Sequence, residues 1–384
     1  MTSRKVAVLI VAAGRGTRLG GGLPKQYRPL MGRTVLQHAI DGVRRALPEA
    51  RVLCVIASGD EAIYRVSVTV GAPATVIGGA TRQESVLNGL EALAKDAPEI
   101  VLIHDAARPF GIEAVAGSLV SAIGEFDGVA AALEVTDSLR RLDGGSLSVV
   151  PREGVWRVQT PQAFRFAAIL AAHREVMGAA MTDDISVAEA AGLEITLVAG
   201  DERAMKITTA ADMLRAERIL LAERSDIRVG HGYDVHAFGP GDSVMLCGIK
   251  VPYVAGLAGH SDADVGLHAL TDAVLGAIGA ADIGAHFPPS DPKWRGAASG
   301  AFLRHAASLV TVKDGVIAHV DVTLVCEAPK IGPHRVAMVA QVAEILGLRE
   351  DRVSVKATTT EGLGFAGRRE GIAAYATATV RLPG

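Results

Sequence analysis

Continuous apolar runs alternate with helix-like segments through the first half of the chain, and this alternation restricts the fold more than any other feature. The runs at 6–13, 51–57 and 100–103 are rich in Val, Ile and Leu, as strands covered on both faces are. Helical patterns lie between them at 34–46 and 85–94. Because strands that alternate with helices form mostly parallel sheets with crossover helices, we predict an α/β, Rossmann-like first domain.

A second pattern begins near residue 225. A long helix is expected over 209–224, followed by a strand at 227–230 and a turn at 231–236. We therefore predict two domains, at residues 1–225 and 226–384, joined by a short connection. The later segments of the second domain predict an α+β fold, with helices over 264–280 and 335–346 and strands over 318–327, 353–357 and 372–381.

Composition excludes several classes of protein. The chain has 384 residues, of which 49% are apolar and 21% charged, so each half can bury a core and disorder is not expected. The formal net charge is -3 without a large basic block, which argues against a nucleic-acid partner. No run approaches about 20 apolar residues, so we expect no membrane span. The three cysteines lie far apart, which predicts reduced thiols in a cytoplasmic protein.

A glycine-rich loop at 12–20 follows the first predicted strand. It is not a dinucleotide fingerprint, because Leu19 occupies the place of the third Gly, and it lacks the Gly-Lys-Ser/Thr ending of a P-loop. Its backbone N–H groups could still face a phosphate, with Arg18 and Lys25 supplying the positive charge that nucleotidyl transfer needs. The loop by itself fits a plain glycine turn with surface cations equally well.

Polar side chains farther along the chain extend this candidate phosphate site. A second glycine turn precedes Arg82 and Ser85, and we expect Ser85 to begin a helix. Asp105 ends a predicted strand, where a carboxylate is well placed for Mg²⁺ in an open α/β sheet, although it could equally cap a helix. Thr182-Asp183-Asp184 and Lys206 complete the set, and each of them taken singly is more often a cap or a solvated charge.

Together these segments resemble the 2-C-methyl-D-erythritol 4-phosphate cytidylyltransferase family over most of residues 4–225. The matching strings are Ala-Ala-Gly-x-Gly-x-Arg, Pro-Lys-Gln-Tyr, His-Asp-Ala-Ala-Arg-Pro and Thr-Asp-Asp, in this order. The resemblance implies a nucleotidyltransferase domain that joins CTP to methylerythritol phosphate and releases pyrophosphate. It also implies a dimer, formed through an arm near 135–150.

The resemblance also implies roles for individual residues. The CTP contacts would come from Ala12, Ala13, Gly14, Gly79 and Ser85, with Arg82 as a further substrate-binding residue. The transition state would be stabilised by Arg18, Lys25 and Lys206. The methylerythritol phosphate would be held by Asp105, Arg152 and Thr182, of which Asp105 and Arg152 count as catalytic and Asp105 lies close to Mg²⁺.

The second half contains a candidate metal site. Asp234-x-His236 places two ligands on one face of an extended segment, and His268 lies on a predicted helix. One carboxylate and two imidazoles make a three-ligand zinc set that leaves a fourth position for substrate. A lone His on an apolar helix is more often a core residue, so the spacing alone leaves both interpretations open.

Residues 227–384 resemble 2-C-methyl-D-erythritol 2,4-cyclodiphosphate synthase. The matching strings are Gly-His-Gly-Tyr-Asp-Val-His, Gly-His-Ser-Asp-Ala-Asp-Val, Asp-Ile-Gly and Lys-Ala-Thr-Thr-Thr-Glu-Gly-Leu-Gly-Phe-Ala-Gly-Arg. The resemblance implies cyclisation of the cytidine diphosphate derivative, in which the 2-phosphate attacks the β-phosphorus and CMP leaves. The implied zinc ligands are Asp234, His236 and His268, and Glu361 would hold Mg²⁺ or Mn²⁺.

The same resemblance implies the remaining substrate contacts of the second domain. Thr359 and His260 would be catalytic, with Thr359 and Lys330 aligning the CDP part. The sugar-alcohol part would be contacted by His260, Ser261 and Asp282. Gly284 would be a further substrate-binding residue. The substrate site would be completed by Ala357, Thr358, Phe365 and Arg368.

The sequence leaves two alternative functions to be tested, and the resemblance also implies an assembly state. One alternative joins a nucleotidyltransferase for another sugar phosphate to an unrelated zinc phosphatase, and the other is a nucleotide sensor with a structural zinc. The resemblance implies a trimeric cyclase and a dimeric transferase, most simply combined in a hexamer. A kinase step must separate the two reactions, and with no P-loop in this chain we expect a separate kinase, which could dock on it.

Overall fold

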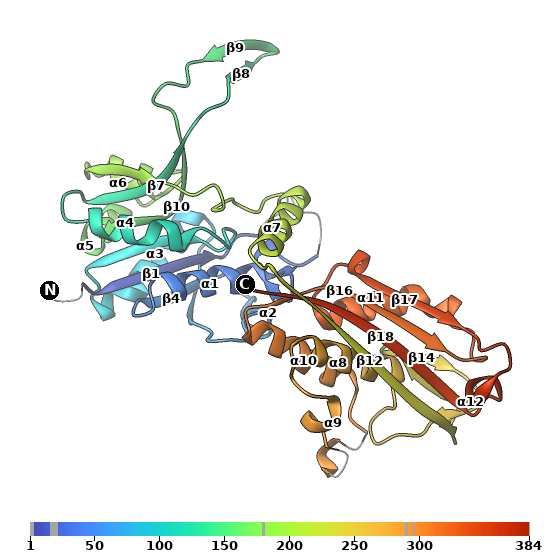
Figure 1. Ribbon diagram of the computed structural model, residues 1–384. Helices are drawn as coiled ribbons and strands as arrows, with labels where there is room; N and C mark the ends of the chain where they lie inside the picture. The colour runs from blue at the N-terminus through green and yellow to red at the C-terminus, as the bar shows by residue number, and fades with distance from the viewer. Residues whose placement is uncertain (1–3, 16–21, 179–180, 289–290, 295, 384) are drawn as a thin grey trace. The chain divides into compact units, whose positions relative to one another are not determined.

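The computed structural model describes residues 4–15, 22–178, 181–288, 291–294 and 296–383 (Figure 1). They form two compact units, one of Met1–Arg28 with Thr34–Leu214 and the other of Pro29–Arg33 with Arg215–Gly384. The division lies inside helix α7 (Ala210–Ala222), close to the position near 225 that the sequence predicts. In the described part of the chain, no helix is long and apolar enough to cross a membrane.

The first unit contains a seven-stranded sheet in the order β11-β7-β10-β6-β1-β4-β5. Its strands are parallel except for β10, which runs antiparallel to both of its neighbours. The mostly parallel sheet predicted from the sequence is therefore confirmed. The strands are β1 (Val6–Ala12), β4 (Arg51–Ile56), β5 (Ala74–Ile77), β6 (Ile100–Asp105), β7 (Gly128–Glu134), β10 (Trp156–Arg165) and β11 (Ile195–Ala199).

Helices cover both faces of this sheet because successive side chains of β1 point to opposite sides. Val8 and Ile10 pack with α1 and α4, whereas Ala7 and Leu9 pack with α3 and α5. Both faces are apolar, which is why the strands read as continuous hydrophobic runs. The helices of this unit are α1 (Val35–Ala46), α2 (Glu61–Ser67), α3 (Arg82–Leu93), α4 (Ile112–Ala122), α5 (Phe166–Glu175) and α6 (Asp184–Ala190).

A two-stranded hairpin projects from the first unit between β7 and β10 (Figure 1). It is formed by β8 (Leu139–Asp143) and β9 (Ser146–Val150), within the arm that the sequence predicts near 135–150. Its apolar side chains Leu142 and Leu147 are each 69% exposed.

Two further short strands are β2 (Pro29–Leu30) and β3 (Arg33–Thr34).

The second unit contains a five-stranded sheet in the order β15-β12-β18-β16-β17. Its strands are β12 (Asp226–Gly239), β15 (Gly256–Leu257), β16 (Val316–Val325), β17 (Val353–Thr358) and β18 (Gly371–Leu382). A hairpin of β13 (Ser243–Leu246) and β14 (Ile249–Pro252) lies outside this sheet.

Three helices bury one face of the five-stranded sheet, and they are α8 (Val265–Ala277), α10 (Gly300–Val312) and α11 (Arg335–Leu346). The short helices are α9 (Ile283–His286) and α12 (Gly364–Gly367). The other face is exposed along β12 and β18, where its large side chains are Ile227, Val229, Tyr233, Val235 and Tyr375. The α+β class predicted for this half is confirmed.

The predicted turn at 231–236 is wrong. These residues belong to β12, which pairs with β18 continuously from Asp226 to Ala237. The glycines that suggested a turn allow a close approach instead: a Cβ at Gly230 would lie 2.0 Å from the Ala273 carbonyl oxygen, and one at Gly232 would lie 1.9 Å from that of Ala269. Strand β12 therefore rests directly on α8.

The predicted helix start at Ser85 is also wrong. Helix α3 begins at Arg82, and its N-cap is Thr81, whose hydroxyl accepts a hydrogen bond from the Glu84 amide at 3.1 Å. Ser85 lies in the first turn, where its own hydroxyl donates to the Thr81 carbonyl at 2.8 Å. Both Thr81 and Ser85 are residue types that cap helices, so the sequence alone does not distinguish them. Thr81 is the N-cap because it has the extended backbone that this position requires.

Candidate active sites

A cavity of about 370 Å³ opens at the carboxyl ends of β1 and β6, where open α/β sheets bind their ligands. It brings together residues from five separate segments of the first unit. The sequence-predicted residues that line it are Ala12, Ala13, Gly14, Lys25, Gly79, Arg82, Ser85, Asp105 and Lys206.

The glycine turn before α3 forms one wall of this cavity by close contact. A Cβ at Gly78 would lie 2.7 Å from the Ala13 Cβ, and one at Gly79 would lie 2.3 Å from the Glu84 Cβ. Ser85 closes the turn, since its hydroxyl accepts a hydrogen bond from the Gly79 amide at 3.1 Å. Only glycine fits these two positions. Because they carry no side chain, the turn can lie against the loop that follows β1.

Charged groups converge on Asp105 at the end of β6. Its Oδ2 lies 2.6 Å from the Lys206 ammonium, and its Oδ1 lies 3.5 Å from Nη2 of Arg82. Burial alone would raise the pKa of Asp105, but these two cations hold it well below its usual range. Lys25 adds a third positive charge close to Lys206. Its ammonium donates to the carbonyl of Ile207, the residue after Lys206, at 3.0 Å. The cavity is thus suited to a polyphosphate.

Two buried residues lie behind Arg82: Asp184, which was a sequence candidate without an assigned contact, and His173, which the sequence did not single out. Arg82 Nη2 lies 2.7 Å from Asp184 Oδ2, and Asp184 Oδ1 lies 3.3 Å from His173 Nε2. The side chains of Asp184 and His173 are 1% and 0% exposed. Burial would raise the pKa of Asp184, and the Arg82 charge lowers it. Asp184 belongs to the Thr-Asp-Asp string, whereas His173 carries no sequence signal.

Two predicted residues lie apart from this cavity, and a third cannot be placed. Arg18 falls outside the described residues. Thr182 is exposed, with its hydroxyl 3.3 Å from that of Ser186. Arg152 is exposed near the base of the hairpin, where it donates to the Thr136 carbonyl. Neither Thr182 nor Arg152 lines the cavity of its own chain.

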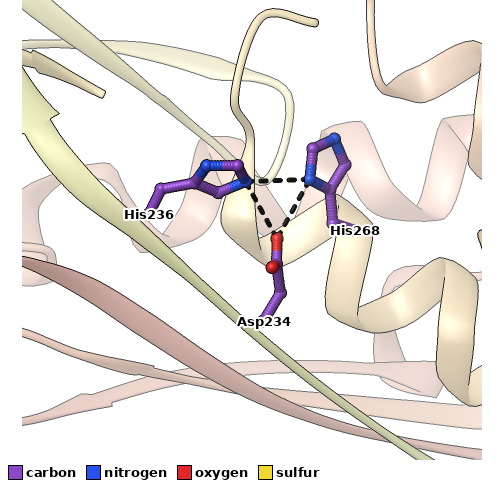
Figure 2. Close-up of side chains that lie close together, drawn as sticks. All are labelled: Asp234, His236 and His268. Atoms are coloured by element: carbon purple, nitrogen blue, oxygen red, sulfur yellow. Dashed lines mark hydrogen bonds and ion pairs between the residues drawn. The ribbon is translucent and has the colours of Figure 1, made fainter. Parts of the chain in front are cut away.

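The predicted zinc ligands of the second unit form one tight cluster (Figure 2). Oδ2 of Asp234 lies 3.0 Å from both His236 Nε2 and His268 Nδ1. The two imidazole nitrogens are 3.1 Å apart. Asp234 and His236 come from β12 and His268 comes from α8, so the glycine contact between these two elements assembles the set.

The hydrogen bonds of each ligand leave one bare atom for a metal. His236 donates Nδ1–H to the Ala258 carbonyl at 2.7 Å, so its Nε2 carries the lone pair that faces the cluster. Asp234 accepts the Val235 amide on Oδ1 at 2.9 Å and turns Oδ2 inward. Two nitrogens and one carboxylate oxygen suit Zn²⁺ with an open fourth position.

The threonine-rich segment forms a loop after β17, which we call the 359–362 loop. The Thr359 hydroxyl donates to Glu361 Oε1 at 2.5 Å, and Glu361 has a left-handed backbone with φ of 52°. Glu327, at the end of β16, secures the loop by accepting the amides of Thr360 at 3.1 Å and Gly362 at 3.2 Å. Sequence reasoning gave Glu327 no role, since only the fold brings the two segments together.

Within one chain the 359–362 loop lies across the sheet from the zinc cluster. Asp234 pairs with Ala374, Ala374 with Leu324, and Leu324 with Ala357. Neighbouring strands lie about 4.8 Å apart, so three such steps separate Ala357 from Asp234 by about 14 Å. Metal cluster and loop are therefore distant parts of a single chain.

The remaining predicted residues of the second unit are spread over several of its elements. The Ser261 hydroxyl is 3.0 Å from His268 Nε2, and the neighbouring His260 carbonyl accepts the Gly296 amide at 2.8 Å. Asp282 caps α9, which contains Gly284, by accepting the Ala285 amide at 2.9 Å. Thr358 ends β17, Lys330 follows β16, Phe365 lies on α12, and Arg368 pairs with Glu370 at 2.8 Å.

Comparisons with known proteins agree with this two-site arrangement. The family model described as 2-C-methyl-D-erythritol 4-phosphate cytidylyltransferase matches residues 6–222, and that of the YgbB family matches residues 227–381. The chain is 54% identical to the bifunctional enzyme IspD/IspF of Paramagnetospirillum magneticum over 382 residues, which cover 99% of each chain. The chain belongs to the bifunctional IspD/IspF family.

Other members of the IspD/IspF family match at similar coverage. The enzyme of Rhodospirillum rubrum is 53% identical over 384 residues and 99% of each chain. The solved structure of the bifunctional IspDF from Campylobacter jejuni is 30% identical, covers 98% of each chain and has a TM-score of 0.49. Family membership makes this chain a bifunctional enzyme of isoprenoid-precursor synthesis, with a cytidylyltransferase and a cyclodiphosphate synthase domain. It excludes both alternatives drawn from the sequence, the phosphatase fusion and the nucleotide sensor.

Proposed function

We propose that the strand-end cavity of the first unit binds CTP and methylerythritol phosphate. Ala12, Ala13, Gly14, Gly79 and Ser85 hold the nucleotide. A phosphate oxygen of methylerythritol phosphate attacks the α-phosphorus of CTP, and the bond to pyrophosphate breaks. Lys25 and Lys206, with Arg18 of the neighbouring loop, stabilise the charge that develops on the phosphate oxygens. The convergence of Lys206 and Arg82 on Asp105 is the observation that carries this assignment.

Asp105 is also the residue that we propose to hold Mg²⁺ in this site. Among the described residues that line the cavity, it is the one carboxylate, and carboxylate oxygens are preferred Mg²⁺ ligands. The Lys206 ammonium now bonded to it would turn toward the phosphates when the cation binds.

We propose that the cluster of Asp234, His236 and His268 binds Zn²⁺ and serves the cyclase reaction. The 2-phosphate of the substrate attacks its own β-phosphorus, and CMP leaves. These three residues would hold Zn²⁺ and Glu361 would hold Mg²⁺ or Mn²⁺, and such ions would supply Lewis-acid stabilisation of the charge on the phosphate oxygens. His260, Ser261, Asp282 and Gly284 contact the sugar-alcohol part. The CDP part is held by Lys330, Ala357, Thr358, Thr359, Phe365 and Arg368.

We also propose that sites of both kinds are completed by neighbouring chains. Arg152 and Thr182 would reach the transferase cavity across a dimer, and the 359–362 loop would meet the zinc cluster of the next chain in a trimer. The distance of about 14 Å across the sheet of one chain supports this sharing. The functional domains would divide near residue 225, as 1–225 and 226–384.

One experiment tests both activities. The transferase product carries a free 2-hydroxyl, whereas the cyclase needs a phosphate there, so a kinase must act between the two steps. Purified protein with methylerythritol phosphate, CTP, Mg²⁺ and Zn²⁺ should stop at the cytidine diphosphate alcohol. ATP and a separate kinase that phosphorylates this alcohol should then release CMP and the cyclic diphosphate. Cyclic product without the kinase would contradict the proposal.

Two variants serve as matched controls in the same assay. Lys25→Ala should lower the first step by about 100-fold or more, because it removes a charge aimed at the reacting phosphorus, and should leave the second step intact. His268→Ala should do the reverse. If either variant impaired both steps equally, the division of labour between the sites would be wrong.

A further inference from the structure

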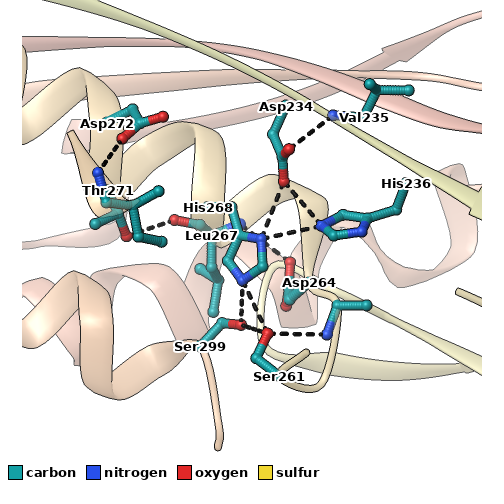
Figure 3. Close-up of polar contacts among 12 residues, drawn as sticks. Asp234, Val235, His236, Ser261, Asp264, Leu267, His268, Thr271, Asp272 and Ser299 are labelled. Carbon is teal, nitrogen blue, oxygen red and sulfur yellow. Dashed lines mark hydrogen bonds and ion pairs between the residues drawn. The ribbon is translucent and has the colours of Figure 1, made fainter. Parts of the chain in front are cut away.

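A second layer of polar residues lies behind the zinc ligand His268, on the side away from the cluster (Figure 3). Its Nε2 is 2.8 Å from the Ser299 hydroxyl and 3.0 Å from the Ser261 hydroxyl. The Ser299 hydroxyl in turn donates to Oδ1 of Asp262. Ser299 lies immediately before α10, 31 residues along the chain from His268.

The direction of each hydrogen bond in the series from His268 through Ser299 to Asp262 follows from the Asp262 carboxylate. An ionised Asp262 can only accept, so the single proton of the Ser299 hydroxyl points at it. The oxygen of Ser299 must then accept the Nε2–H of His268. With its proton on Nε2, His268 keeps a lone pair on Nδ1, the atom that faces Asp234 and His236.

The position of Ser299 indicates that its hydroxyl serves this series of hydrogen bonds and not the capping of α10. A Ser at a helix N-cap normally turns its hydroxyl to a backbone amide of the first turn. Ser299 makes no such cap bond, and its hydroxyl turns to His268 instead. The residue is completely buried, and its backbone amide donates to Asp262 Oδ2 at 3.1 Å. Asp262 therefore holds both the backbone and the hydroxyl of Ser299.

The two serines differ in how firmly they are held. Ser261 is half-buried and accepts the Ala263 amide at 3.2 Å. Its hydroxyl makes no bond to a carboxylate among those described, so it is free to turn to a substrate while Ser299 keeps its place.

We propose that Ser299 and Asp262 are positioning residues that fix the ring orientation and tautomer of His268 for metal binding. This inference rests on the proposed zinc site. Groups that hold the second nitrogen of a metal-binding His raise the affinity of the site by about 10- to 100-fold. Ser299 and Asp262 thus couple the start of α10 to the metal.

The test is the zinc affinity of the metal-free full-length chain, measured by competition with a chromophoric chelator. Ser299→Ala should bind zinc about 10-fold more weakly than the unmodified chain. Ser261→Ala removes a hydroxyl from the same nitrogen and is the matched control, for which a smaller loss is expected.

A double-mutant cycle separates Asp262 from general effects on the loop. In Asp262→Asn the amide can turn its NH₂ group toward Ser299, whose proton would then point at His268, so zinc binding should weaken. In the Ser299→Ala background the same change should have little further effect, because Asp262 acts through Ser299. Additive losses would overturn the proposal.

Thermal unfolding of the metal-free variants distinguishes positioning from folding. Positioning predicts similar unfolding temperatures with different zinc affinities. An unchanged zinc affinity in Ser299→Ala, with or without a lower unfolding temperature, would refute the inference while leaving the zinc site itself intact. If the unmodified chain bound no zinc, the proposed zinc site would be the part that fails.

Discussion

Arg82 contacts two carboxylates from different elements, Asp105 at the cavity and Asp184 behind it. The distance to Asp184 is the shorter of the two, and His173 contacts the far side of that carboxylate. A guanidinium is planar, so a firm contact on its buried side sets the direction of its remaining N–H groups. The orientation of Arg82 in the cavity thus depends on two residues that do not line it.

Asp184→Asn tests this dependence. The amide keeps the size of the side chain but removes the charge that binds Arg82, and a hydrogen bond to a charged group contributes about 1.5–3 kcal/mol. We expect kcat/KM for cytidylyl transfer to fall by about 10-fold or more, with cyclase activity unchanged. Asp183→Asn is the control, because Asn caps α6 as well as Asp does. Equal losses in both variants would argue against a specific role for Asp184.

At the scale of elements, the zinc cluster depends on the contact between β12 and α8. Gly230 and Gly232 let the strand lie against carbonyl oxygens of the helix. Asp234 and His236 follow on the same face of the strand, at the spacing that brings them to His268. Asp234 and His236 are therefore placed by the absence of side chains two to six residues earlier.

Gly232→Ala should separate these two elements. Its Cβ would lie 1.9 Å from the Ala269 carbonyl oxygen, so the strand must move away from α8. Forced overpacking of this kind costs about 1–3 kcal/mol of folding free energy, and the same movement should lower the bound zinc. Thermal unfolding and metal analysis of the purified variant measure the two effects.

Gly276→Ala provides the comparison within the same pair of elements. This glycine is inside α8, and a Cβ there would have its nearest neighbour at 3.8 Å. Ala is favoured over Gly in a helix by about 0.5–1 kcal/mol, so this variant should be slightly more stable and keep its zinc. A loss of zinc in Gly276→Ala as large as that in Gly232→Ala would contradict the steric explanation.

At the scale of the whole molecule, two exposed apolar surfaces favour association. One is the hairpin of β8 and β9, and the other is the uncovered face of the five-stranded sheet with Tyr233 and Tyr375. Contiguous apolar patches of this kind commonly mark protein interfaces. A two-fold contact at the hairpin and a three-fold contact at the sheet would combine most simply in a hexamer.

Changing Leu142 and Leu147 together to Glu should weaken the two-fold contact alone. Both side chains are exposed in the single chain, so the fold should tolerate the change. Light scattering should report six chains for the unmodified protein and three for the variant. Cytidylyl transfer should fall, because the proposed dimer would bring Arg152 to the partner's site, while cyclisation persists. An unmodified protein that scatters as a monomer would refute the assembly.

The sequence alone determined the elements and the residue types of both sites. Helix 335–346 has the predicted bounds, and the strand at 6–12 is one residue shorter than predicted. Such elements follow from the periodicity of apolar residues, which can be read from residues close together in the sequence. The spacing of Asp234 and His236 indicated only a candidate metal site on one face of an extended segment, and the family resemblance supplied the full set with His268.

Only the tertiary structure decided what surrounds those residues. Ser299 reaches His268 from 31 residues away, and Asp184 reaches Arg82 from 102. The glycines of β12 suggested a turn because local patterns do not reveal a helix that packs against the strand. Such contacts arise from packing between distant segments, where complementary shape and hydrogen-bond partners are selected together, and no local pattern in the sequence specifies them.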